Sequence, residues 1–406
     1  MPQYRAAWLL PISQPPIRDA WILTGRGKVV AFGHSRNRDR TVSGEIDLGD
    51  ATILPGLVNA HTHLELSWMR GRIPETDDFP AWIRSVISLM HQTAENAAEV
   101  ELAIGEAIEE ARRHGTVLIG DISNTLATSI PLSERGMAAR VFHELVGFKA
   151  TEASKLVEGA LSKLEKMATG ELVRHSLAPH APYSVSPALF RCIRSALKHD
   201  PFARSSIHLG ESAAETEFLR EGAGPWRLLL EELGTWDPAW VAPKCRPVEY
   251  LDRMGFLDDR LLAVHGVQFS SLDLERLAAT GTTLVTCPRG NLRTGAGAPP
   301  VAAFYNSGNR VAIGTDSLAS VPDLSIFAEL AELRRMAPEV PARALVESAT
   351  INGACALGFE SEFGTIEAGK RDRLIAVDTP RSIVDVEEYL VSGIKPAQIR
   401  WLDAVQ

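Results

Sequence analysis

Residues 53–63 read Ile-Leu-Pro-Gly-Leu-Val-Asn-Ala-His-Thr-His, an apolar stretch that becomes polar only at its end. We expect this stretch to form a buried strand that carries His61 and His63 at its C-terminal end. Successive side chains of a strand point to opposite faces, so both imidazoles would lie on one face, where they suit a single metal ion. Two surface histidines with this spacing can also arise by chance.

Seven further short, β-branched apolar runs follow, and helical patterns lie between several of them. At 97–114 and 151–168, apolar residues recur with the 3.6-residue period of a helix. Eight strands that alternate with helices predict a (β/α)₈ TIM-like barrel of the α/β class. A doubly wound open sheet is the alternative, because counting strands does not separate the two. The seven runs are Thr116–Asp121, Arg140–Glu144, Leu172–His180, Ser206–Glu211, Leu261–His265, Thr282–Cys287 and Arg310–Asp316.

The two ends of the chain show a different pattern of short strands and turns. The runs 21–23 and 29–33 flank a glycine turn near the N-terminus, and the runs 364–367 and 374–377 flank another near the C-terminus. Each end alone would bury too little apolar surface to be stable, so we expect both to build one small β-sandwich domain. The expected domains are 1–54 plus 365–406 for the sandwich and 55–364 for the barrel.

The segment 222–254 is long for a connection between a strand and a helix, and it contains Trp226, Trp236 and Trp240. Long loops in compact domains are often lids over an active site. The alternative is that the three tryptophans only pack against the outer helices.

The composition is that of an ordinary globular protein. The chain has 406 residues, of which 45% are hydrophobic and 23% charged, which excludes a disordered chain. A net charge of −9 argues against a nucleic-acid partner, and no apolar run approaches the roughly 18 residues of a membrane span. The N-terminus lacks the apolar core of a signal peptide, and the scattered cysteines indicate neither a disulfide framework nor a zinc ribbon. We therefore expect a cytoplasmic protein.

Polar residues also end three other predicted strands. These are His208 on the fifth strand, His265 on the sixth and Asp316 on the eighth. Active sites of barrels lie at the C-terminal ends of their strands. His61, His63, His208 and Asp316 would together make a site for Zn²⁺ or Fe²⁺.

These motifs resemble the amidohydrolase superfamily, in its branch of adenosine, S-adenosylhomocysteine, cytosine and guanine deaminases and chlorohydrolases. The resemblance extends over nearly the whole chain. Within the branch, residues 61–67, 79–83 and 315–320 are most similar to aminofutalosine deaminases, whereas Gly290 and Val321 depart from the common serine and asparagine. The matching motifs are Pro55–Glu65, Ala178–Ser184, Ile207–Glu211, Cys287–Leu292, Gly314–Ser317, Asn352–Ala354 and Gly364–Lys370.

The resemblance implies a single divalent ion. In this superfamily, sites with two metals usually need a carboxylated lysine on the fourth strand. That strand ends here at His180, and no lysine lies between Glu171 and Ser186. We expect one Zn²⁺, with Fe²⁺ as the alternative.

The resemblance also assigns the acid–base residues. Glu211 would take a proton from water and pass it to the ring nitrogen and the leaving amine of the substrate. His265 would orient the water, and Asp316 would accept a proton as well as bind the metal. The alternatives are that Glu211 is a solvated loop residue and His265 a satisfied core histidine.

Four further residues are candidates for contact with the substrate. His180 resembles a substrate-contact histidine, while Glu65 and Trp82 follow the first strand and could meet a ribose or a base. Arg289 could meet a carboxylate or a ring edge. Ordinary packing or surface roles are the alternatives for Glu65, Trp82 and Arg289, and a structural role for His180.

The resulting prediction is a metal-dependent hydrolase acting on the C–N bond of a cyclic amidine, a deaminase of an aminopurine nucleoside. Aminodeoxyfutalosine, adenosine and S-adenosylhomocysteine are the expected substrates. The alternatives are a guanine or cytosine deaminase or an s-triazine chlorohydrolase, all of which use the same chemistry. A catalytically silent binding barrel is a further alternative, but it predicts losses at the metal ligands or Glu211. The expected partner is a small molecule, with a homo-oligomer possible.

Overall fold

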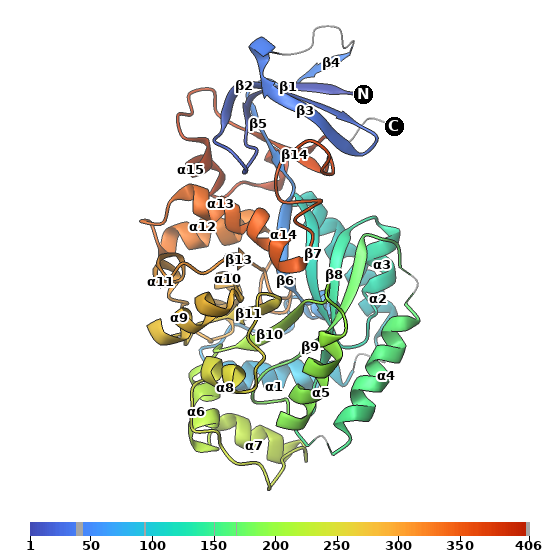
Figure 1. Ribbon diagram of the computed structural model, residues 1–406, viewed down its shortest axis with the longest axis vertical. Coiled ribbons are helices and arrows are strands. Elements are labelled where there is room, and N and C mark those ends of the chain that lie inside the picture. Colours follow the sequence, from blue (N-terminus) through green and yellow to red (C-terminus); the bar gives the residue numbers. More distant parts are fainter. Residues whose placement is uncertain (38–43, 93–94, 150, 168, 403–406) are drawn as a thin grey trace.

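Eight parallel strands in the middle of the chain form two four-stranded sheets in the computed structural model, which describes residues 1–37, 44–92, 95–149, 151–167 and 169–402 (Figure 1). The strands are buried along nearly all of their length, as is usual for parallel sheets covered on both faces. The first sheet contains, in order, β6 (Leu57–Thr62), β7 (Thr116–Ser123), β8 (Ala138–Leu145) and β9 (Val173–Pro179). The second contains β10 (Ser205–Leu209), β11 (Leu261–His265), β12 (Thr283–Thr286) and β13 (Val311–Ile313).

Within each sheet, every strand pairs with its neighbour in the sequence. The order of a doubly wound sheet reverses at a switch point, so that alternative is wrong. Backbone hydrogen bonds also link the two sheets at their carboxyl ends. The amide of His208 donates to the carbonyl of His180 at 3.0 Å, and the amides of Thr315 and Asp316 donate to the carbonyl of His61 at 3.1 Å each. These bonds place β10 beside β9, and β13 beside β6.

Helices connect the strands, and the two predicted from periodicity are present. The helices before β10 are α1 (Phe79–Met90), α2 (Ala97–Arg113), α3 (Ser129–Glu134), α4 (Ala153–Glu165) and α5 (Pro187–Lys198), with the 3₁₀ helix η2 (Leu64–Met69). Those after it are α6 (Ala213–Glu221), α7 (Pro225–Glu232), α8 (Pro247–Arg253), α9 (Ser271–Thr280), α10 (Pro288–Arg293), α11 (Val301–Asn306), α12 (Ile326–Met336), α13 (Ala342–Ser348) and α14 (Ile351–Leu357).

Both ends of the chain contribute to one seven-stranded sheet at the opposite end of the molecule from α7 (Figure 1). β5 pairs in parallel with β1 and antiparallel with β14, so this sheet joins strands from the two ends of the chain. Its strands are β1 (Gln3–Leu9), β2 (Ile17–Gly25), β3 (Lys28–His34), β4 (Glu45–Asp47), β5 (Ala51–Pro55), β14 (Leu374–Asp378) and β15 (Ile399–Trp401). The short helices α15 (Val386–Leu390), η1 (Ser35–Asn37) and η3 (Pro396–Gln398) lie in the same two regions of the sequence.

Alternating side chains of this sheet enter two different cores. Leu54 and Ile375 pack with the helical residues Phe327 and Leu330, which attaches the sheet to α12. Ile53, one residue from Leu54, packs instead in the core of the terminal sheet itself. The alternation follows from the period of two in a strand, and it fastens the terminal sheet to the rest of the fold.

Two strand predictions need correction. The single strand expected over 53–63 is two strands, because the chain leaves the terminal sheet after β5 and enters the parallel sheet at β6. Gly56 lies between them, where a Cβ atom would stand 2.1 Å from a methyl group of Val117. The strand expected at 364–367 is also wrong: Gly364 has a φ of +87°, and the amide of Ile366 donates to the carbonyl of Pro11 outside any ladder.

The segment 222–254 contains α7 and α8, and its tryptophans are packed. Trp226 is 1% exposed and stacks on Tyr183 with ring centroids 4.1 Å apart. Trp236 stacks on Phe148. The tryptophans are therefore packed, but Trp226 and α7 also line the cavity described below, and the role of this segment as a lid stays a prediction.

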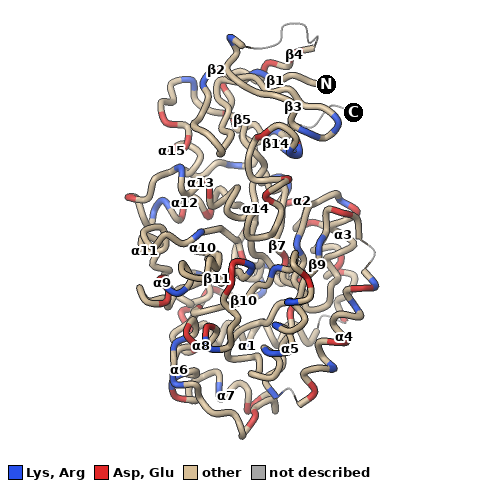
Figure 2. Tube along the Cα trace, viewed as in Figure 1, with Lys and Arg blue, Asp and Glu red and all other residues tan. Residues whose placement is uncertain are grey.

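Acidic and basic residues are interspersed along both parts of the fold (Figure 2). No helix among the described residues combines the length and the apolar character that crossing a membrane requires.

Candidate active site

Four predicted metal ligands converge at the carboxyl ends of the parallel strands. His61 lies in β6, His63 directly after it, His208 in β10 and Asp316 after β13. The Nε2 atoms of His63 and His208 are 3.2 Å apart. The Oδ1 atom of Asp316 is 3.6 Å from Nε2 of His63 and 3.9 Å from Nε2 of His61. The structure thus brings all four together.

The donor atoms fit a metal ion. Tetrahedral zinc with bonds of about 2.0–2.1 Å to nitrogen separates its ligand atoms by roughly 3.4 Å. The separations of 3.2, 3.6 and 3.9 Å in the structure lie around this value. His61 is fully buried, and neither of its ring nitrogens has a hydrogen-bond partner in the described part of the chain. Burying a polar group without a hydrogen-bond partner costs free energy. The burial of His61 therefore favours a ligand bound at its ring nitrogens.

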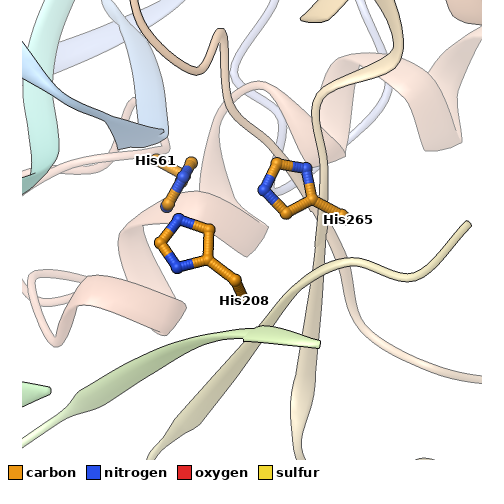
Figure 3. Close-up of side chains that lie close together, drawn as sticks. All are labelled: His61, His208 and His265. Atoms are coloured by element: carbon orange, nitrogen blue, oxygen red, sulfur yellow. The ribbon is translucent and has the colours of Figure 1, made fainter. Parts of the chain in front are cut away.

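His61, His208 and His265 form a second group whose ligand atoms lie within 4.8 Å of one another. Figure 3 shows the three rings converging, with a nitrogen of each turned toward the space between them. A third group, Glu144, His180 and His208, shares His208. The clustered imidazoles therefore belong to one centre.

Unusual backbone conformations hold this centre. His265 and Asp316 have positive φ angles of 78° and 61°, which side-chain-bearing residues rarely adopt. Such strain persists only where surrounding structure enforces it, and it concentrates at functional sites. At Gly314 a Cβ atom would lie 2.6 Å from the carbonyl oxygen of His61. Only glycine allows β13 to approach β6 this closely.

Hydrogen bonds to the surrounding chain fix how His208 presents its ring. Its Nδ1 atom lies 3.0 Å from the carbonyl oxygen of His180, to which it can only donate. In the neutral ring, Nε2 is then unprotonated and faces His63 as a potential ligand atom. The Glu144 carboxylate, 3.5 Å from the same Nδ1, adds a second partner.

Glu211 and His265 lie next to each other beside the ligand group. The Nε2 atom of His265 is 3.5 Å from Oε1 of Glu211, while its Nδ1 atom is 2.8 Å from Oδ1 of Asn291. A carbonyl oxygen accepts, so Nδ1 carries the proton and Nε2 has a free lone pair. Glu211 is held through its backbone, whose amide donates to a buried carboxylate oxygen of Glu215 at 3.0 Å.

Burial sets the charge states of the site. It lowers the pKa of His208 to about 4 and that of His265 to about 3, so both rings are neutral at pH 7, the form that binds metals. Burial raises the pKa of Asp316 to about 6. It also raises the pKa of Glu211 well above its usual value, and the nearby Asp316 carboxylate adds to this effect.

A cavity of about 660 Å³ opens onto these residues, a size typical of a small-molecule site. His180 and Trp82 both line it, with the Nδ1 atom of His180 at 2.6 Å from the Ser184 hydroxyl. The polar lining comes from His63, Asn124, Glu144, His180, Ser184, His208, Glu211, His265 and Asp316, among others, and the apolar lining from α1, α7 and nearby loops.

Glu65 and Arg289 do not line this cavity. The Glu65 carboxylate accepts from the Thr125 hydroxyl at 2.6 Å and the Asn124 amide at 3.1 Å, which anchors the loop after β7. The guanidinium of Arg289 donates to Asp323 at 2.9 Å and lies 3.6 Å from Glu329. Substrate contacts by these two residues stay predictions.

Sequence reasoning missed several residues of the site. Glu144 was the last residue of a predicted strand, so its position at a strand end was a usable signal. Asn291 lies inside a motif that was recognised, but its partner His265 is 26 residues away in the sequence. Tyr183 and Trp226, which stack on each other and line the cavity, carry no local signal for that pairing.

Comparisons with known proteins identify related sequences and related folds. A 5-methylthioadenosine/S-adenosylhomocysteine deaminase of Teredinibacter turnerae is 30% identical over 394 residues, which are 92% of this chain and 83% of the relative. An adenosine deaminase of Xanthomonas campestris with bound zinc superposes with a TM-score of 0.83 at 25% identity, covering 98% of this chain and 90% of the other.

The aminofutalosine deaminase of Helicobacter pylori, in complex with methylthio-coformycin, also superposes with a TM-score of 0.83. Its identity is 23%, and the match covers 99% of this chain and 97% of the other, which shows a shared fold. The model of the amidohydrolase family matches residues 52–399. The chain therefore belongs to the amidohydrolase family.

Proposed function

We propose that this protein is a metal-dependent hydrolase that deaminates a 6-aminopurine nucleoside and releases ammonia. The observation that carries the proposal is the adjacency of the four-ligand group to the Glu211–His265 pair, at the polar wall of one cavity. The deaminase names of relatives at about 30% identity support the same reaction.

One divalent ion, Zn²⁺ with Fe²⁺ as the alternative, would be held by His61, His63, His208 and Asp316. When bound, such an ion supplies Lewis acidity that lowers the pKa of water toward neutrality. The neighbouring ligand groups share His61 or His208, which favours one ion over two.

The acid–base work falls to residues of the chain. Glu211 takes one proton from the attacking water and delivers it to the ring nitrogen beside the reacting carbon. The second water proton passes, by way of Asp316 or Glu211, to the amine, which leaves as ammonia. His265 accepts a hydrogen bond from the water through its free Nε2 atom and orients the attack. The water oxygen thus replaces the amine on the reacting carbon, and both protons of the water are accounted for, one on the ring nitrogen and one on the ammonia.

His180 and Trp82 line the cavity and are proposed to contact the nucleoside directly. Glu65 and Arg289 would act less directly in this account, by anchoring the loop after β7 and the start of α10. A direct substrate contact through either residue would require its present bonds to rearrange.

We also propose that the two parallel sheets close into one (β/α)₈ barrel over 55–364. The hydrogen bonds between β9 and β10 and between β13 and β6 support closure. Residues 1–54 and 365–406 would form a small β-sandwich. Strands β4 and β5 both pair with the same edge of β1, β4 at its N-terminal end and β5 at its C-terminal end. The sheet therefore divides at β1, which supports a sandwich.

A panel of substrates tests the proposed function. Ammonia release should occur with adenosine, 5′-methylthioadenosine, S-adenosylhomocysteine or aminodeoxyfutalosine. Guanine, cytosine and a chlorinated s-triazine represent the alternatives, since the same centre could serve them. Turnover of one of these three, with no response from any 6-aminopurine nucleoside, would overturn the proposal.

A further inference from the structure

The cavity has an apolar wall as well as the polar one that carries the metal-ligand group. Helices α1 and α7, at the end of the molecule far from the terminal sheet, contribute most of it (Figure 1). Trp82 and Val86 come from α1, and Leu229, Leu230 and Leu233 come from α7 and its C-terminal end. The whole cavity, at about 660 Å³, has more room than a purine ring alone would fill.

No lysine or arginine lines the cavity among the residues that the structure describes. The charged side chains that do line it are the carboxyl groups of Glu144, Glu211 and Asp316. Helix α1, which contributes to the apolar wall, contains Arg84. Arg84 donates to both carboxylate oxygens of Glu232 on α7, at 2.9 and 3.0 Å, and so ties the two helices together.

We propose that the apolar wall holds the 5′ substituent of the nucleoside, and that it selects a neutral, apolar substituent against one that carries a carboxylate. The inference rests on the proposed function, because it places the 6-amino end of the purine at the metal-ligand group. The 5′ substituent lies at the other end of such a nucleoside and would face α1 and α7.

The selection has a physical basis in desolvation and charge. A carboxylate that packs against the apolar wall loses its water and finds no lysine or arginine there to replace it. Glu144 and Glu211, which are not among the proposed metal ligands, add repulsion wherever they are ionised. An alkylthio substituent instead gains from burial against leucine, valine and tryptophan side chains.

A matched pair of ligands isolates the effect of charge. 5′-Isobutylthioadenosine and 5′-carboxymethylthioadenosine have the same branching and number of heavy atoms in the tail, but only the second is an anion at pH 7. Their dissociation constants and their kcat/KM values would be measured on the metal-loaded protein. We expect the neutral compound to bind at least about tenfold more tightly and to react correspondingly faster.

A pair of variants locates the effect. Leu233→Arg places a cation at the α7 wall, and Leu233 is 44% exposed, so the fold should tolerate it. Leu228→Arg adds the same charge to the same helix at a residue that is 56% exposed and does not line the cavity. Leu233→Arg should reduce or reverse the preference for the neutral tail, whereas Leu228→Arg should leave it unchanged.

The outcomes separate this inference from the proposed function. Absence of ammonia from every nucleoside overturns the function, while the binding ratio still decides the inference. A ratio near one, a preference for the carboxylate, or no measurable binding of either compound overturns the inference. Equal effects of Leu233→Arg and Leu228→Arg would also overturn it, because a general change of charge would then explain the result.

Discussion

The Nε2 atom of His265 lies 3.5 Å from a carboxylate oxygen of Glu211 and has no hydrogen-bond partner among the described residues. Its other ring nitrogen is engaged with Asn291. A free acceptor therefore stands beside a buried acid at the edge of the metal-ligand group. A water that contacts both groups from one side would have one group to orient it and another to exchange protons with it.

Replacing Glu211 by Gln keeps the size of the side chain but removes its proton transfer. We expect kcat to fall by about 10²–10⁴-fold, the usual range for a general acid–base residue. Metal content, measured by plasma emission, should stay the same. The control is Glu217→Gln, an exposed residue of α6, which should keep normal turnover. Full activity of Glu211→Gln would exclude the shuttle role.

Asn291 is expected to act by positioning His265. In Asn291→Ala the Nδ1 hydrogen of His265 loses its acceptor, so the ring can rotate or change tautomer. We expect kcat to fall by about tenfold or more with little change in KM, since the lost interaction serves the reacting water. A rise in KM with unchanged kcat, measured by initial rates, would instead place Asn291 in substrate binding.

The residues at the strand ends could be predicted from the sequence, because the parallel strands of this fold are short, apolar and end in polar side chains. His61, His208, His265 and Asp316 could be found in this way. The division of 53–63 into β5 and β6 could not, because both halves are equally apolar and the break depends on the contact between Gly56 and Val117.

Contacts between segments that lie far apart in the sequence could not be predicted either, because they also depend on how the elements pack. The neutralisation of Arg289 by Asp323 and Glu329 depends on how α10 meets the region around α12. The hydrogen bonds between Glu65 and the loop after β7 depend on a bend of that loop, which no local sequence pattern predicts. Substrate contacts by both residues therefore stay predictions, although each side chain already has partners in the protein.

His61 offers a test of the metal centre, because its ring nitrogens have no described partner in the protein. In His61→Asn, zinc should fall from about one equivalent to well below half. Because an ion that binds only the folded state stabilises it, the unfolding midpoint of the variant should be lower. Removing zinc from the wild-type protein with a chelator should lower its midpoint toward that of the variant.

The control for this experiment is His199→Asn, an exposed histidine at the end of α5. It should keep its zinc and its midpoint. A His61→Asn protein with a full equivalent of zinc would show that His61 is not a ligand.

Asp121 should make stability depend on pH. Burial raises the pKa of Asp121 to about 8, although Thr128 and the Leu64 amide donate to its carboxylate. Between pH 4 and 8 the folded state then binds one more proton than the unfolded state. The free energy of unfolding should therefore fall as pH rises, by about 1.4 kcal/mol per pH unit from this group.

Asp121→Asn removes this contribution while keeping an acceptor for Leu64. Urea unfolding at several pH values should show that the variant loses less stability than the wild type as pH rises from 5 to 8. Asp259→Asn, at an exposed residue, serves as the control and should follow the wild type. Parallel curves for Asp121→Asn and the wild type would show that Asp121 is ionised throughout.

The central claim is hydrolytic removal of the 6-amino group from a purine nucleoside, and product analysis in H₂¹⁸O tests it most directly. The zinc-loaded protein would be incubated with 5′-methylthioadenosine or adenosine, and the products analysed for ammonia and by mass spectrometry. We predict one ammonia per nucleoside consumed and one ¹⁸O atom bound to C6 of the purine base of the product. Unchanged nucleoside, or a product without ¹⁸O in the base, would contradict the account.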